Sequence, residues 1–279
     1  TKAAHYLAVE EIRVPIGADL RADVAATAAQ VGTRTARVVG SAPCYPYGVV
    51  DPISDLARLA ADHDTLCHVD ACLGGWLLPF WREIGEPVPP WDFSVDGVTS
   101  ISADIHKYGY CFKGASVVIH RDVEMKRRQH FVFDGWPGGL YGSATTAGTR
   151  PAAPIAAAWA TIQHLGRDGY LAKARTVRAA TRKFVDGVES IDELQLTVPP
   201  DMSLFEFSAR SGADATGAIA DVMDDRGWRL DRQQGGLHLM ISPGHLAVAD
   251  DFVADLDHAV ADRGVSRGVE ARYGGVVDP

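Results

Sequence analysis

The sequence predicts an α/β protein with a large domain built on a mostly parallel sheet and a small C-terminal α+β domain. Up to residue 119, short apolar runs alternate with helical or loop-forming segments, a pattern typical of parallel strands joined by crossovers. From residue 152 the chain is alanine-rich and helical to about residue 190, and strand and helix patterns then alternate again. We place the boundary inside this long helical stretch, with the large domain at 1–170 and the small domain at 171–279.

In the large domain, each expected strand is a short apolar run. A helix is expected at 55–62, after Asp51-Pro52, because proline is favoured in the first turn of a helix. The expected strands are at 11–16, 36–40, 65–69, 98–103 and 116–119.

In the small domain, strands are expected at 194–198, 204–208 and 237–242, and helices at 214–226 and 248–262. Gly166 and Gly169 lie inside the long helical stretch that precedes these strands, and they should interrupt it. Residues 267–279 are glycine-rich with little apolar periodicity, so we expect this tail to be mobile or to rest on a partner.

Composition excludes several classes of function. The 279 residues are 47% hydrophobic, which is enough for one large core or for one large and one small core. The net charge of -9 means that the protein has little broad electrostatic attraction for nucleic acid. The apolar stretches at 71–81 and 151–162 fall short of the roughly 20 residues that cross a bilayer, and no signal-peptide pattern opens the chain. We therefore expect a cytoplasmic protein without a membrane span.

The four cysteines form no CxxC pair. We interpret them as reduced thiols, with neither a disulfide framework nor a metal site.

The strongest chemical signal is the joint placement of Asp70 and Lys107. Asp70 closes the apolar run of LCHVDACLGGW, and Lys107 follows the run of SISADIHKYGYCFKG. Taken singly, the lysine is most simply a solvated charge and the aspartate a turn former. Together they fit pyridoxal phosphate, whose aldehyde condenses with a lysine and whose ring nitrogen stays protonated against a carboxylate.

The segments HVDACLGGW, SISADIHKYGY, APCYPYGVVDPI and YGSATTAGTRPAAPIAAAWATIQHLGRDGY resemble the pyridoxal-phosphate-dependent group II decarboxylase family. The resemblance runs from about Ala42 to Tyr170 and is closest to the sphingosine-1-phosphate lyases of that family. It implies the fold of the fold-type I transferases, with a partial cofactor-binding domain at 1–170.

The resemblance also implies residue roles in cofactor binding. Lys107 would form the Schiff base, and Asp70 would pair with the pyridinium nitrogen. His106 would bond the cofactor phosphate, while Gly148 and Thr149 would reach a phosphate across the interface of a homodimer whose active site is shared. Thr149 stands where these lyases usually have serine, and it keeps the hydroxyl.

The substrate contacts implied by the resemblance are less firmly placed. Lys113 is a candidate to bind the phosphate of the substrate. The nearly equal alternative is that Lys113 is only a surface lysine in a turn, since Cys111-Phe112 replaces the usual Ala-Pro before it. Tyr45 or Tyr47 is a candidate acid/base, although packing explains an aromatic in such a turn slightly better. His68 lies two residues before Asp70 and should share its face of the strand.

The expected reaction is carbon-carbon cleavage of a phosphorylated sphingoid base to a long-chain aldehyde and phosphoethanolamine. Amino-acid decarboxylation is the alternative within the same chemistry, since the orientation of the substrate decides which bond breaks. A non-catalytic dimerisation module is the alternative outside it.

The start of the chain resembles the middle of a helix. Family members carry an upstream phosphate-binding loop and a histidine that stacks on the cofactor ring, and neither is found here; His5 is a weak substitute for the latter. We therefore expect this chain by itself to be a fragment with little or no activity.

Overall fold

The computed structural model describes residues 1–233 and 235–269. Its first sheet has the order β1-β2-β3-β4, with β1, β2 and β3 parallel and β4 antiparallel to β3. The expected mostly parallel sheet is confirmed. Its strands are β1 (Arg37–Ser41), β2 (Leu66–Asp70), β3 (Val98–Asp104) and β4 (Ser116–His120).

Helix α3 (Ile53–Asp62) packs on this sheet, mainly against β1 and β2. It begins directly after Pro52 and buries one stripe of apolar residues at helical spacing. Cys67, Val69 and Val98 belong to the same hydrophobic core, so the first core lies between the helical layer and the sheet. The stripe consists of Ile53, Leu56, Ala57 and Ala60.

The N-terminal segment contains helices α1 (Lys2–Leu7) and α2 (Val24–Ala28). The strand expected at 11–16 is wrong. Only an isolated bridge between Ile16 and Ala22 is formed there, and the side chain of Ile16 is half exposed. An apolar run becomes a strand only where a neighbouring strand accepts its backbone hydrogen bonds, and this run has none among the described residues.

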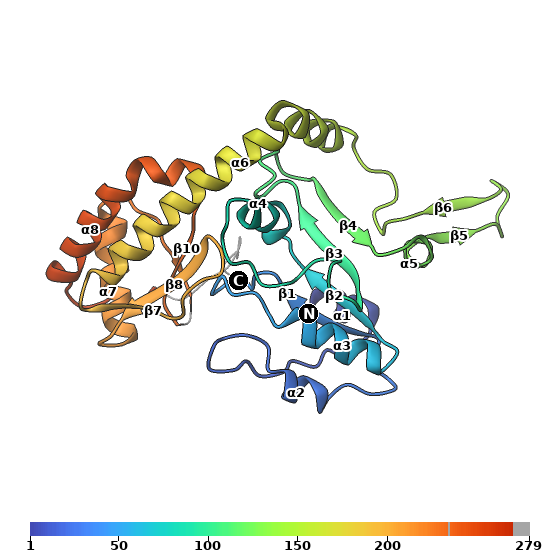
Figure 1. Ribbon diagram of the computed structural model, residues 1–279, viewed down its shortest axis with the longest axis horizontal. Helices are drawn as coiled ribbons and strands as arrows, with labels where there is room; N and C mark the ends of the chain where they lie inside the picture. The colour runs from blue at the N-terminus through green and yellow to red at the C-terminus, as the bar shows by residue number, and fades with distance from the viewer. Residues whose placement is uncertain (234, 270–279) are drawn as a thin grey trace.

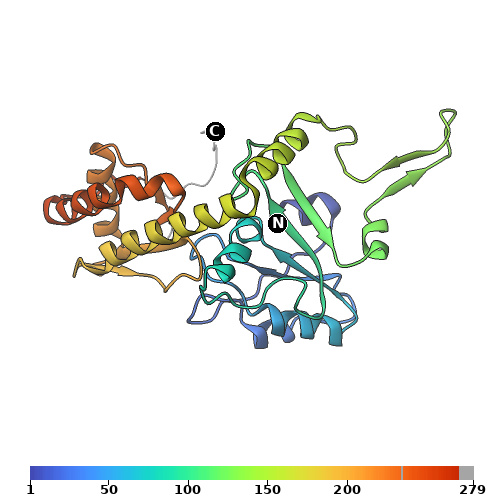
Figure 2. The ribbon, with the colours of Figure 1, turned by 45° about the horizontal axis from the view of Figure 1, so that its top comes forward.

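A hairpin of β5 (Phe131–Phe133) and β6 (Tyr141–Ser143) was not predicted, and it extends away from the rest of the molecule (Figures 1 and 2). It follows helix α5 (Val123–Arg127). Its apolar side chains are exposed, Phe131, Trp136 and Leu140 among them. Periodic burial therefore could not have revealed it.

Helix α6 (Ala153–Glu189) runs from the first sheet to the C-terminal sheet (Figure 1). Gly166 interrupts it, with φ 56° and ψ −177°, whereas Gly169 remains helical and does not. Ala174 belongs to the first core, and Phe184 belongs to a second. One helix thus contributes side chains to both cores. The domain boundary at 170/171 stays a prediction.

The second sheet is antiparallel, in the order β7-β8-β10-β9. Phe205, Phe207 and Leu237 belong to the core that it forms with the helices. This confirms the expected α+β pattern and adds the short strand β9. The elements are β7 (Leu194–Leu196), β8 (Leu204–Ala209), α7 (Ala213–Asp225), β9 (Asp231–Arg232), β10 (Leu237–Met240), η2 (Pro243–Val248) and α8 (Ala249–Asp262).

The tail is fixed at its beginning. The backbone N–H of Arg267 donates to Asp221 on α7 over 2.6 Å, so residue 267 is anchored rather than mobile. Residues 270–279 lie outside the described residues.

Candidate functional site

Asp70 ends β2 with its side chain exposed at the carboxyl edge of the sheet. Its Oδ1 accepts hydrogen bonds from the backbone N–H of Cys72 at 3.1 Å and from the hydroxyl of Ser102 at 3.3 Å. Ser102 is the direct neighbour of Asp70 on β3. The carboxylate is therefore oriented by two donors, and it faces the position where a ligand of an open parallel sheet binds.

His68 supports Asp70 through Ser102. Its Nδ1 lies 2.8 Å from the hydroxyl of Ser100 and its Nε2 lies 3.3 Å from that of Ser102. Burial lowers the pKa of His68, which favours a neutral ring that accepts from one serine and donates to the other. The expected placement of His68 and Asp70 on one face is confirmed.

Lys107 follows β3 and is held by Asp104, the last residue of that strand. Its Nζ lies 3.0 Å from Asp104 Oδ2, and its side chain is 30% exposed. Burial alone would raise the pKa of Asp104, but hydrogen bonds from Ser116 and Lys107 outweigh it and lower that pKa. Asp104 is thus an ionised carboxylate that fixes the lysine. Sequence reasoning missed it, although it stands three residues before the lysine in ADIHK.

His106 is fixed by the backbone. Its Nδ1 lies 2.8 Å from the carbonyl oxygen of Ala115, which can only accept, so Nδ1 carries a hydrogen. Its Nε2 lies 3.8 Å from Asp104 Oδ2. His106 can therefore donate to a phosphate through Nε2 only when both ring nitrogens carry a hydrogen.

Tyr108, next to Lys107, ties this segment to the C-terminal sheet. Its hydroxyl donates to the carbonyl of Ile241 at 2.8 Å and accepts from Ser203 at 2.7 Å. Burial raises the pKa of Tyr108, so the phenol stays protonated and keeps its donor. No signal in the sequence singled out this residue.

The turn that carries Tyr45 and Tyr47 follows β1 and begins beside Asp70, since Ala42 N–H donates to the Asp70 carbonyl at 2.8 Å. Gly48 has φ 70°, and a Cβ on it would lie 1.9 Å from the carbonyl oxygen of Leu204. This position therefore requires glycine, because only glycine lets the turn approach β8 so closely.

The two tyrosines of this turn differ in their surroundings. The hydroxyl of Tyr45 donates to Asp231 Oδ2 at 2.8 Å. Burial raises the pKa of Tyr47, and the nearby Glu206 and Cys44 raise it further. The raised pKa keeps the phenol of Tyr47 protonated at neutral pH, so its hydroxyl remains a hydrogen-bond donor.

Lys113, Gly148 and Thr149 complete the set of predicted site residues. Lys113 and Thr149 are exposed, and Gly148 stands in a loop after β6 where its N–H donates to Thr145. Within the described part of the chain, no hydrogen bond or ion pair joins these three residues to Lys107. His5 is exposed on α1, with its ring 5.7 Å from that of Tyr6, and it too makes no such contact with Asp70 or Lys107.

All four cysteines are free thiols in the structure, as expected. Burial raises the pKa of Cys67 to about 11. Burial and then the hydrogen bond with Asp70 raise the pKa of Cys72 to about 12. Both remain protonated at neutral pH. None of the described helices is long and apolar enough to span a bilayer.

Curated relatives match the chain over nearly its whole length. It is 43% identical over 261 residues to a sphingosine-1-phosphate lyase of Arabidopsis thaliana, covering 93% of this chain and 48% of that one. It is 36% identical to sphingosine-1-phosphate lyase 1 of Rattus norvegicus, covering 98% and 50%. The chain therefore spans about half the length of these relatives.

Solved structures agree on the fold. A sphingosine-1-phosphate lyase of Burkholderia pseudomallei matches with a TM-score of 0.90 at 38% identity, covering 94% of this chain and 60% of that one. A glutamate decarboxylase of Lactobacillus brevis, at 22% identity and a TM-score of 0.78, covers 94% and 63% and supports the fold alone. These matches confirm the fold-type I architecture.

The model of the pyridoxal-dependent decarboxylase conserved domain matches residues 1–210. That span contains both strands whose ends carry Asp70 and Lys107. The chain belongs to the pyridoxal-dependent decarboxylase family, whose cofactor is pyridoxal phosphate.

Proposed function

We propose that the complete protein is a carbon-carbon lyase that cleaves a phosphorylated sphingoid base to a long-chain aldehyde and phosphoethanolamine. The observation that carries the proposal is the placement of Asp70 and Lys107 at the carboxyl ends of the neighbouring parallel strands β2 and β3. The choice of substrate is supported by identities of 43% and 33% to sphingosine-1-phosphate lyases of Arabidopsis thaliana and Saccharomyces cerevisiae.

The residues at this sheet edge fit pyridoxal phosphate by their chemistry. Lys107 offers a partly exposed amine, and Asp70 offers an exposed carboxylate already oriented by Cys72 and Ser102. His106 stands beside Lys107 as a candidate hydrogen-bond donor to the cofactor phosphate. When bound, the cofactor supplies a protonated ring that accepts the electrons of the bond that breaks.

Side chains of this protein would then stabilise charge and transfer protons. Asp70 would hold a proton on the ring nitrogen, because a nearby negative charge favours the cationic form. Asp104 would hold the amine of Lys107 in place until it reacts. Tyr45, whose hydroxyl donates to Asp231, is the candidate to accept the proton of the substrate hydroxyl while its own proton passes to Asp231, and Tyr47 is the candidate donor.

We further propose a homodimer in which Gly148 and Thr149 reach the phosphate site of the partner. The loop that holds them is exposed and follows a hairpin with exposed Phe131 and Trp136. Clustered apolar exposure of this kind favours coverage by another protein surface. Lys113 is proposed to meet the phosphate of the substrate. If the site is shared, mixing an inactive Lys107→Ala chain with an inactive Thr149→Ala chain should restore part of the turnover.

A decarboxylase is the second candidate. It is supported by an L-aspartate/L-glutamate decarboxylase of Pyrococcus horikoshii, which is 29% identical and of which the match covers 67%. The complete natural chain should be loaded with cofactor and given a sphingoid base phosphate, its dephosphorylated form, and acidic or aromatic amino acids. Aldehyde release from the phosphorylated base alone supports the lyase. Carbon dioxide release from an amino acid supports the decarboxylase, and turnover of none supports a non-catalytic module.

A further inference from the structure

A row of polar side chains crosses the C-terminal sheet on one face. His238 on β10 is the direct cross-strand partner of Glu206 on β8 and of Asp231 on β9. Direct partners share a face of the sheet. Glu206 and His238 are each 2% exposed, although the flanking Phe205 and Phe207 show that the opposite face forms an ordinary apolar core. We call Glu206, His238 and Asp231 the polar row.

The polar row holds the turn of Tyr45 at three points. Asp231 Oδ2 accepts the hydroxyl of Tyr45 at 2.8 Å. The ring of His238 lies 4.4 Å from the ring of Tyr45, tilted by 48°. His238 Nδ1 lies 3.1 Å from the carbonyl oxygen of Pro46, to which it must donate. The hydroxyl, the ring and the adjacent backbone of Tyr45 are thus all fixed by two residues.

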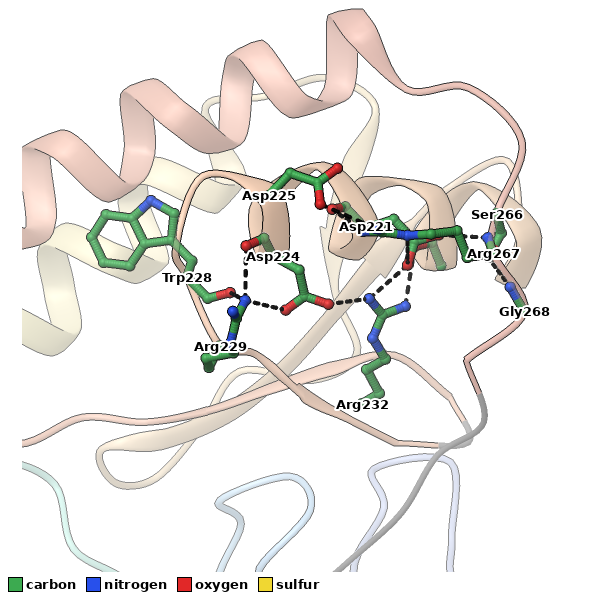
Figure 3. Close-up of polar contacts among 10 residues, drawn as sticks. Asp221, Asp224, Asp225, Trp228, Arg229, Arg232, Ser266, Arg267 and Gly268 are labelled. Carbon is green, nitrogen blue, oxygen red and sulfur yellow. Dashed lines mark hydrogen bonds and ion pairs between the residues drawn. The ribbon is translucent and has the colours of Figure 1, made fainter.

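An ion-pair network fixes the strand that carries Asp231. Strand β9 has only two residues, too few to hold a side chain by sheet pairing alone. The guanidinium of Arg232 lies 2.7 Å from Asp221 and 2.6 Å from Asp224, both on α7 (Figure 3). Arg267 also contacts Asp221 (Figure 3). Arg232 therefore anchors β9 to α7 and with it the position of Asp231.

Burying the polar row lowers the stability of the fold relative to apolar side chains at the same positions. Glu206 Oε2 and His238 Nε2 are buried and have no hydrogen-bond partner among the described residues. An apolar pair at this place would avoid the cost of burying unpaired polar atoms. Groups retained at such a cost concentrate where function needs them.

We propose that His238, with Asp231, is a positioning residue for Tyr45, so that the C-terminal sheet sets the orientation of the phenol at the site beside Asp70. This inference rests on the proposed function for the role of Tyr45. It adds that the orientation comes from residues almost 190 positions away in the chain, since 186 residues separate Tyr45 from Asp231. His238 itself need not touch the substrate.

The test compares His238→Leu with His238→Asn in the complete, cofactor-loaded chain. The leucine removes the hydrogen bond to Pro46, whereas the amide of asparagine can donate from the position of Nδ1. We expect His238→Leu to lower kcat by about tenfold with KM nearly unchanged, and His238→Asn to restore most of the loss. Asp255→Asn is the matched control, because Asp255 bonds Arg226 and Trp228 in the same part of the fold without contacting the turn.

A second readout is independent of turnover. With 3-fluorotyrosine at position 45, the fluorine NMR signal should shift or broaden in His238→Leu and return in His238→Asn. An unchanged signal and kcat in His238→Leu, or an equal loss of kcat in Asp255→Asn, would overturn the proposal. If the unsubstituted protein cleaves no sphingoid base phosphate but the fluorine signal responds as expected, the proposed function fails while the positioning role stands.

Discussion

The hydroxyl of Tyr108 donates a 2.8 Å hydrogen bond to the carbonyl of Ile241, 133 residues farther along the chain. Because Tyr108 directly follows Lys107, this contact ties the segment that carries Lys107 to the C-terminal sheet. The same sheet holds Tyr45 through Asp231. The segment that carries Lys107 and the turn that carries Tyr45 are therefore both held by the C-terminal part of the chain.

Removing the Tyr108 hydroxyl should destabilise the protein. In Tyr108→Phe, the buried Ile241 carbonyl loses a donor and Ser203 loses its acceptor, which should cost about 1–3 kcal/mol of unfolding free energy. Tyr110→Phe is the control, since the buried Tyr110 hydroxyl has no hydrogen-bond partner among the described residues. Urea denaturation of both variants measures the difference. Equal losses would show that the hydroxyl of Tyr108 contributes nothing specific.

Asp104→Asn should slow the reaction of Lys107 with the cofactor. The variant replaces a charged contact of 3.0 Å between Asp104 and Lys107 by a neutral one. Hydrogen bonds to charged groups are worth about 1.5–3 kcal/mol. If this bond orients the reacting amine, its loss should lower the rate by about tenfold or more. Rapid mixing with pyridoxal phosphate measures the rise of visible absorbance. Asp92→Asn, which disturbs a carboxylate paired with Arg82, should react at the normal rate. Normal kinetics in Asp104→Asn would remove Asp104 from the site.

Glu206→Gln should change how stability depends on pH. Burial raises the pKa of Glu206, while the hydrogen bond from Thr197 opposes the shift. A carboxyl with a raised folded-state pKa stabilises the fold below its unfolded pKa and loses that contribution as pH rises through the folded pKa. The Tm of Glu206→Gln minus that of the unsubstituted protein should therefore increase from about pH 5 to about pH 8. The exposed Glu193→Gln should show a constant difference, and the same constancy for Glu206→Gln would contradict a raised pKa.

Asp70→Asn should impair turnover while leaving the fold intact. A close pair of opposite charges at an effective dielectric of about 20 interacts by roughly 4 kcal/mol, enough to move the pKa of a pyridine nitrogen by about three units. Asparagine retains an oxygen for the bonds from Cys72 and Ser102 but lacks the charge. We expect kcat to fall by orders of magnitude with circular dichroism unchanged. Near-normal turnover would separate Asp70 from the cofactor ring.

Local sequence pattern predicted the elements whose burial is regular. The apolar runs that became β1, β2 and β3 gave the correct sheet and placed Asp70 and Lys107 at strand ends. The run at 11–16 has no neighbouring strand, and its Glu11, Arg13 and Pro15 make it less apolar and less suited to a strand interior than the runs that paired. The β5–β6 hairpin exposes its aromatic residues, so no alternation of burial indicated it.

The supporting contacts of the site could not be predicted. Asp104 follows the run expected at 98–103 directly, and no local pattern marks it as the partner of Lys107. Asp231 and Ile241 reach Tyr45 and Tyr108 across 186 and 133 residues, and no local spacing encodes such contacts. The short strand β9 is held largely by ion pairs with α7, which hydrophobic periodicity does not record.

The central claim is that Lys107 is the lysine that bonds to pyridoxal phosphate, and borohydride reduction tests it most directly. The complete protein should be incubated with the cofactor, reduced, digested and mapped by mass spectrometry. The account predicts that a visible absorbance band disappears on reduction, that the label lies on the peptide containing Lys107, and that Lys107→Ala takes up no label. Stoichiometric label on Lys113 or another lysine, or full labelling of Lys107→Ala, would contradict it.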